Sequence, residues 1–191
     1  MRTLLVLVFC GLLGMMGCKE QAKESSESPA AKASEPSSEA SKPVTHELEL
    51  MRNMQSKTKV PLAITFPGDW RIEQDEMSFN AYHPDVPASS PFNNLFLVLY
   101  DCDADMKPED CVSKWMETLY FLDSLSSMKR EELEDGRVWL TEQTKKGYFD
   151  ARLFVPKPEG SWVATCGFIV PKDKKDFQKA YKTACESLVF R

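Results

Sequence analysis

Short segments in which apolar and polar residues alternate dominate the chain after residue 45. A period of two places every second side chain on the same face of an extended strand, so each segment predicts a half-buried β-strand. The expected strands are His46 to Met51, Leu62 to Phe66, Met77 to His83, Asn94 to Tyr100, Met128 to Glu134, Arg137 to Gln143, Phe149 to Val155 and Trp162 to Val170. Turn residues at Asp135-Gly136, at Lys146-Gly147 and in 156–160 separate the last four strands, which favours an antiparallel meander.

Two segments show helical periodicity instead. In Pro108 to Leu122 the apolar residues recur every three or four positions, and Pro108, Glu109 and Asp110 suit a first helical turn. In Asp173 to Leu188 one face carries Phe177, Ala180, Tyr181, Ala184 and Leu188. Strands, a helix, further strands and a second helix predict the α+β class.

The N-terminus predicts an export signal. Met1 and Arg2 form a short positive start, and Thr3 to Leu13 form an apolar run. The apolar stretch of about fifteen residues is shorter than the roughly 20 that span a bilayer as a helix. Residues 15–18, Met-Met-Gly-Cys, resemble the lipobox of bacterial lipoproteins, in which the cysteine is lipidated and becomes the mature N-terminus. We therefore expect a signal peptide over 1–17 and lipidation of Cys18; the alternative is an ordinary secretory signal that ends near Cys18.

The segment 18–45 predicts a disordered tether. After Cys18 it contains seven Ser, five Glu, four Lys and three Pro, and apart from Val44 it has no large apolar residue. Such a composition buries too little surface to offset chain entropy, and a coil of this length reaches roughly 30 Å. Residues 46–191 then have a usual length for one domain. The formal charge of −5 argues against a nucleic-acid partner.

The order of elements resembles a known fold. PLAITFPGDWRI, the pair MSFNAYHP and NLFLVLYD, and the helix PEDCVSKWMETL match its first half. DGRVWLTEQT, the hairpin FDARLFVPKPEGSWVATCGFIV and the helix KDFQKAYKTACESLVF match its second half. This pattern, over about Val60 to Arg191, resembles the PsbP-like domains, and the lipobox agrees best with their bacterial DcrB-like branch. The resemblance implies an α/β/α sandwich with a central antiparallel sheet and helices on both faces.

Four cysteines of the expected domain, Cys102, Cys111, Cys166 and Cys185, predict two disulfides in an exported protein. Of the three connectivities we expect Cys102 with Cys111, because one short loop joins a strand end to the next helix start. We expect Cys166 with Cys185, because the last strand should lie under the last helix.

The stretch DCDADMKPEDC, residues 101–111, invites a metal interpretation. Asp101, Asp103 and Asp105 match the first, third and fifth positions of a calcium loop. Met106 stands where such a loop needs Gly, and Val112 stands where it needs Glu. Zinc is disfavoured because the cysteines lack C-x-x-C spacing and a nearby His. We expect no metal and no cofactor, with Asp103 and Asp105 left as candidate contact residues.

No catalytic motif of the common hydrolase, metalloprotease or nucleotide-binding types is present. His46 lies at the junction with the tether and His83 precedes Pro84, so exposed histidines are expected at both positions rather than general bases. Trp70, Tyr82 and Phe92 are candidates for a surface recognition patch, the alternative for Trp70 being packing in the core or a turn.

The expected protein is therefore a non-enzymatic, lipid-anchored protein of the bacterial cell envelope that faces the periplasm and docks another envelope protein. Lys19 stands after the cysteine in place of the Asp that, in enteric-type sorting, retains lipoproteins at the inner membrane, so the outer membrane is slightly favoured. The alternative function is a small-ligand or metal-binding module that uses the loop from Tyr82 to Phe92 and the acidic loop.

Overall fold

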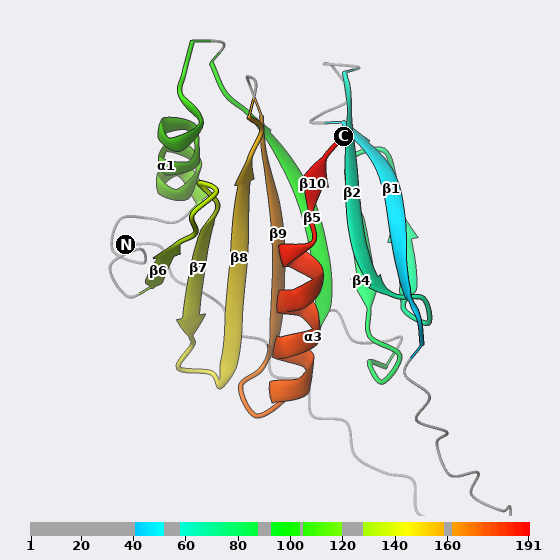
Figure 1. Cartoon of the computed structure of the whole chain (residues 1–191). Helices are drawn as coiled ribbons and strands as arrows, with labels where there is room; N and C mark the ends of the chain where they lie inside the picture. Colours follow the sequence, from blue (N-terminus) through cyan, green and yellow to red (C-terminus); the bar gives the residue numbers. More distant parts are fainter. Residues whose placement is uncertain (1–40, 52–57, 88–92, 104, 120–127, 159–161) are drawn as a thin grey trace, which may run out of the picture. The chain divides into compact units, whose positions relative to one another are not determined.

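Figure 1 shows the computed structural model of the chain, which describes residues 41–51, 58–87, 93–103, 105–119, 128–158 and 162–191. All of them belong to one compact unit, Glu39–Arg191. The elements are β1 (Pro43–Met51), β2 (Lys59–Pro67), β3 (Arg71–Gln74), β4 (Phe79–Tyr82), β5 (Asn94–Asp101), α1 (Pro108–Leu119), β6 (Lys129–Glu132), β7 (Val138–Gln143), β8 (Tyr148–Pro156), β9 (Trp162–Pro171), α3 (Lys175–Glu186) and β10 (Val189–Phe190).

The strands form two antiparallel sheets. One has three strands in the order β1-β2-β10, and the other has seven in the order β3-β4-β5-β9-β8-β7-β6. The expected meander is confirmed, because β6, β7, β8 and β9 are successive neighbours. Gly136 and Gly147 have positive φ in the turns of this meander, a backbone conformation that glycine adopts without steric cost.

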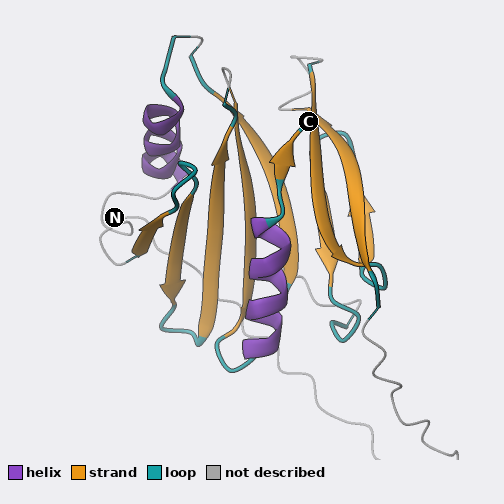
Figure 2. Ribbon diagram, in the orientation of Figure 1, coloured by secondary structure: helices purple, strands orange, loops and turns teal. Residues whose placement is uncertain are grey.

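The predicted α/β/α sandwich is wrong. Strands hold 51% of the described residues and helices only 19% (Figure 2). The three-stranded sheet and α3 cover one face of the seven-stranded sheet: Leu50 and Ile64 share one apolar core with Leu97, Cys166 and Tyr181. On the opposite face α1 covers only a corner, where Met116 packs with Val138, Phe154 and Val163. No helical layer therefore sandwiches the sheet in the described part of the chain.

Local pattern explains which elements were found and which were missed. The eight expected strands are present with shifted ends, whereas β3 and β10 were not predicted because four and two residues show too little alternation. β1 begins at Pro43, before the expected domain start at 46; its start was missed because residues 43–45 contain one apolar side chain, Val44, and show no alternation. The predicted end of the first helix, Leu122, lies outside the described residues.

Both predicted disulfide pairings are confirmed. Cys102 bonds Cys111 with a Cα–Cα distance of 5.6 Å, and Cys166 bonds Cys185 at 5.4 Å. The first bond links the end of β5 to α1, and the second links β9 to α3. Both connections are local in the topology, which is why the order of elements was sufficient to predict them.

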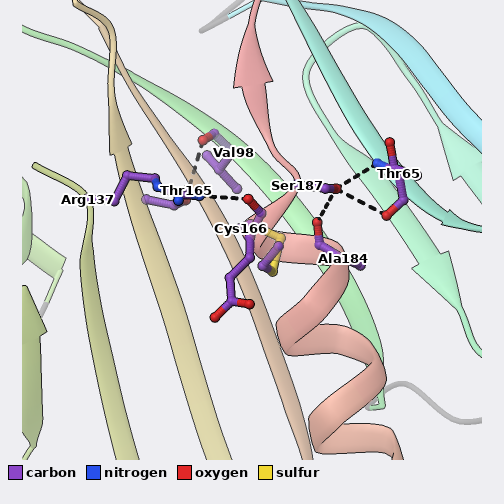
Figure 3. The surroundings of a disulfide bond; sticks show 9 residues. Thr65, Val98, Arg137, Thr165, Cys166, Ala184 and Ser187 are labelled. Carbon is purple, nitrogen blue, oxygen red and sulfur yellow. Dashed lines mark hydrogen bonds between the residues drawn. A yellow bond between two sulfur atoms is a disulfide. The ribbon is translucent and has the colours of Figure 1, made fainter. Parts of the chain in front are cut away.

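The C-terminal end of α3 joins the two sheets (Figure 3). Cys185 attaches the helix covalently to β9 of the larger sheet. Two residues further on, the Ser187 hydroxyl accepts a hydrogen bond from the Thr65 N–H of β2 at 2.7 Å. The same hydroxyl shares its proton between the carbonyl oxygens of Ala184 at 2.6 Å and Thr65 at 3.1 Å. The chain then continues as β10, which pairs with β2.

Candidate functional site

The sequence-predicted recognition residues near the turn after β2 do not form one surface. Trp70 is only 5% exposed and belongs to the core between the sheets. Tyr82 is half-buried beneath Arg71, whose Cζ lies 4.2 Å from the ring centroid, and its hydroxyl donates to Glu73 at 3.1 Å. Phe92 lies outside the described residues. Trp70 therefore contributes to packing, whereas Tyr82 contacts Arg71 and Glu73.

The acidic loop lies at the other end of β5 from Tyr82. Tyr82 pairs with Asn94, where β5 begins, and the strand runs seven residues further to Asp101. At about 3.3 Å per residue these ends are roughly 23 Å apart. Asp103 forms an ion pair with Lys114 of α1 at 3.0 Å, and Asp105 is exposed. Within the described ranges, no group of three or more His, Cys, Asp or Glu side chains is placed to hold a metal ion.

His83 lies between two hollows. Its ring packs 4.7 Å from Phe177 and 5.8 Å from Trp70, and Nδ1 lies 3.7 Å from an Asp85 carboxylate oxygen. The larger hollow, of about 760 Å³, lies between residues 83–87 and the start of α3. Its charged lining is mixed: His83, Asp85, Asp173, Lys174, Lys175 and Asp176.

The second hollow is a groove of about 590 Å³ between β2 and α3, with Phe66, Ala180 and Ala184 in its lining. It shares His83 and Asp176 with the first hollow. Sequence reasoning missed both hollows because their walls join segments that are distant in the chain: residues 83–87 with 171–177 in the first, and residues 65–67 with 176–187 in the second.

The Tyr181 side chain of α3 is hydrogen-bonded to the backbone of His83 and Asn93. Its hydroxyl donates to the Asn93 carbonyl at 2.6 Å and accepts the His83 N–H at 3.1 Å. Burial raises the pKa of Tyr181 to about 12, because the phenolate form would lose its hydration inside the core. The loop that begins at His83 is therefore attached to α3 through a neutral, fully bonded phenol.

The most regular exposed backbone in the described part of the chain is the outer edge of β1. This strand is nine residues long and pairs with β2 in an unbroken register from Pro43–Pro67 to Met51–Lys59. In the strand order it has a neighbour on one side only, and Figure 1 shows it at the margin of its sheet. An edge strand of this kind leaves every second peptide unit without a partner from its own sheet.

Three contacts identify which peptide units of β1 face outward. Both Thr65 backbone groups bond Ser187, on the side of β2 away from β1, and the Pro61 carbonyl accepts the Arg191 N–H on that same side at 3.1 Å. Their register partners, Thr45 and Glu49, therefore have their N–H and C=O groups on the open edge, and so does Glu47 between them.

The end of β1 supports this alternation independently. The Met51 N–H turns away from β2 and bonds the Glu76 carbonyl at 2.7 Å. Among the described residues no hydrogen bond uses the outward N–H groups of Thr45, Glu47 or Glu49. The open part of the edge therefore spans residues 45–49, and we call it the β1 edge.

The other sheet edges are short. β3 and β6 have four residues each, β6 consists entirely of exposed charged residues, and β10 has two residues. Short and charged edges discourage the addition of another strand. On β1, in contrast, His46 stacks on Phe66 with a centroid distance of 4.3 Å, and burial lowers the pKa of its imidazole. The strand is thus held firmly on its inner face while its edge stays open.

Comparisons with known proteins give little further information. No family model matches the chain, and no curated protein matches it. A crystal structure from Bacteroides thetaiotaomicron VPI-5482, whose title names no function, is similar at 19% identity and a TM-score of 0.47. The match covers 68% of this chain but 45% of the other, so the chain spans less than half the length of that protein. No described helix is long and apolar enough to cross a membrane.

Proposed function

We propose that this chain is a non-enzymatic, lipid-anchored protein of the bacterial cell envelope whose domain docks another envelope protein. The observation that carries docking is the β1 edge, a regular strand with outward N–H and C=O groups at Thr45, Glu47 and Glu49. Such an edge is a template for an added strand, in which main-chain hydrogen bonds supply affinity. Two disulfides support export, because disulfides persist mainly in oxidising compartments.

The position of β1 in the chain fits this proposal. β1 is the first described strand, and it begins at Pro43, within the last three residues of the polar segment 18–45. A lipid on Cys18 would hold a partner at the β1 edge within roughly 30 Å of the membrane surface, the coil reach of the tether. The outer membrane, on its periplasmic side, is the favoured location because of Lys19.

The test of docking blocks the edge without breaking the sheet. Because the Glu47 N–H faces outward, Glu47→Pro removes a donor for an added strand but no bond to β2. We expect capture of the full chain from mild detergent to recover a stoichiometric partner with the wild type and with Glu47→Ala. Glu47→Pro should recover at least tenfold less.

Glu49→Pro provides a second blocked position, and thermal melting of each variant checks the fold. Equal recovery by the folded proline variants and the wild type would show that the β1 edge does not dock the partner. No recovery by any form, together with a rise of several degrees in melting temperature with one small metabolite, would favour the second candidate function.

That second candidate is a small-ligand module. The hollow of about 760 Å³ beside His83 lies in the size range of ligand pockets and is bordered by the predicted loop that starts at Tyr82. Its mixed charges select no ligand class, whereas the β1 edge has a defined pattern of donors and acceptors. Docking is therefore the function that the geometry supports best.

The anchor has a separate test. We expect Cys18→Ala to leave an unprocessed precursor or to release a soluble form, because the thiol of Cys18 is the group that would carry the lipid. Cell fractionation and the mass of the mature N-terminus measure this. Cys10→Ala is the matched control, since it changes the other cysteine of the apolar segment. Unchanged processing and membrane attachment of Cys18→Ala would refute the lipoprotein proposal.

A further inference from the structure

We propose that the segment that adds to the β1 edge is an extended basic–apolar strand, with Lys or Arg at every second position and apolar residues between them. It would run antiparallel to β1. This inference rests on the proposed docking function and identifies the chemistry of the partner.

The side chains on the β1 edge define the basic positions. The residues with outward peptide units, Thr45, Glu47 and Glu49, alternate along the strand, so their side chains share one face of the sheet. Glu47 is exposed, and the side chain of Glu49 is 62% exposed. In an antiparallel pair, a residue that exchanges two hydrogen bonds with Glu47 lies directly opposite it, at a Cα distance of about 5.5 Å. A cation at that position faces a carboxylate.

Two described basic side chains near the glutamates, Lys59 and Arg191, lie on the β2 side of β1. Lys59, 3.7 Å from Glu49, is on β2, and Arg191 follows β10 and lines a small hollow with both glutamates. Neither cation occupies the open edge, where the added strand would lie. Because Lys59 and Glu49 are both more than half exposed, water screens their attraction strongly. The edge itself therefore presents two carboxylates.

The other face of β1 defines the apolar positions. Val44, which alternates with the outward-facing residues, has 43% of its surface exposed and is one of the two exposed large apolar side chains of the described residues. His46 and Leu48 follow it on the same face. An added strand whose intervening side chains are apolar would cover Val44 and extend the core between the sheets. A segment in which every side chain is charged would place charged groups against Val44 and would not extend the core.

A second copy of this chain fits the edge poorly. In antiparallel pairing of two β1 edges, the register with the fullest overlap places Glu47 opposite Glu47. Like charges directly opposite each other destabilise a strand pair. The two glutamates thus oppose self-association and favour a basic partner.

The test uses the full chain in mild detergent and the labelled peptide KVKVKVK, with binding followed by fluorescence anisotropy. We expect saturable binding to the wild type and at least tenfold weaker binding of the acidic peptide EVEVEVE. The double variant Glu47→Lys/Glu49→Lys should reverse this preference. Glu47→Gln/Glu49→Gln should weaken binding of the basic peptide without strengthening binding of the acidic peptide. Thermal melting verifies that each variant is folded.

Backbone methylation separates strand addition from simple charge attraction. In the proposed register the lysine amides face β1 and the valine amides face away. N-methylation of the lysine amides should abolish binding, whereas N-methylation of the valine amides should leave it within about twofold. Equal binding of the two methylated peptides would overturn the inference.

Partner capture distinguishes failure of this inference from failure of the docking function. If Glu47→Lys/Glu49→Lys recovers as much partner as the wild type while Glu47→Pro recovers none, docking at the edge stands and the proposal that the added strand is basic is refuted. If both variants recover as much as the wild type, docking at the edge and the basic partner fail together.

Discussion

Replacing Cys166 and Cys185 together by alanine lowers the free energy of unfolding by about 3 kcal/mol, the loop-entropy value for a disulfide that closes a loop of this length. The bond spans 19 residues, and both cysteines are fully buried between β9 and α3. Loss of the sulfur atoms also leaves a cavity, which adds to the destabilisation. Urea unfolding followed by circular dichroism measures the change as a lower midpoint.

The matched control is the other disulfide. Cys102 and Cys111 are separated by nine residues, so their removal should cost less, about 2.5 kcal/mol. The Cys166–Cys185 bond also supports the end of α3, where Ser187 bonds β2, so hydrogen exchange should increase at the Thr65 amide in the first variant alone. A larger loss of stability on removal of the Cys102–Cys111 bond than on removal of the Cys166–Cys185 bond would contradict this account of the C-terminal end of α3.

Trp70→Ala should destabilise the domain by about 3 to 5 kcal/mol, the usual cost of truncating a buried tryptophan. The indole is stacked on Phe66 at a centroid distance of 5.1 Å and packs edge-on against Tyr181 at 4.9 Å. It therefore fills the space where the two sheets and α3 meet. Equilibrium unfolding in urea gives the free energy difference.

Tyr82→Ala provides the comparison for Trp70. Tyr82 is half-buried, and its replacement removes mainly the stacking under Arg71 and the hydrogen bond to Glu73. We therefore expect the free energy of unfolding to fall by about 1 kcal/mol. Trp70→Phe, which keeps an aromatic ring in the core, should fall between the two. A loss below about 1 kcal/mol for Trp70→Ala would instead place the indole at the surface, as the recognition-patch hypothesis required.

Local features of the sequence predicted the elements well. Alternation identified eight of the strands, and the Asp-Gly and Lys-Gly pairs identified the turns where Gly136 and Gly147 adopt positive φ. The helix starting at Pro108 was predicted from the three- and four-residue spacing of its apolar residues, together with its acidic first turn. The disulfide pairing followed because each pair joins consecutive elements of the chain.

The candidate site was predicted much less well. Trp70 was predicted as either a surface or a core residue because periodicity does not reach into the turn after β2. The hollow beside His83 is lined by residues from 83–87 and 171–177, which are distant in the chain. The openness of the β1 edge depends on the strand order, and nothing within 43–51 distinguishes an edge strand from a central one.

By itself, the sequence determined the strand and helix segments, the turns and the cysteine pairs, because these depend on periodicity and on neighbours a few residues apart. Only the tertiary structure decided that β1, β2 and β10 form a separate sheet over the larger one. The reason is that β10 reaches β2 through the end of α3, where Ser187 bonds Thr65, and this contact joins residues 122 positions apart in the chain. That arrangement leaves one side of β1 unpaired, and it thereby makes Glu47 and Glu49 candidate contact residues.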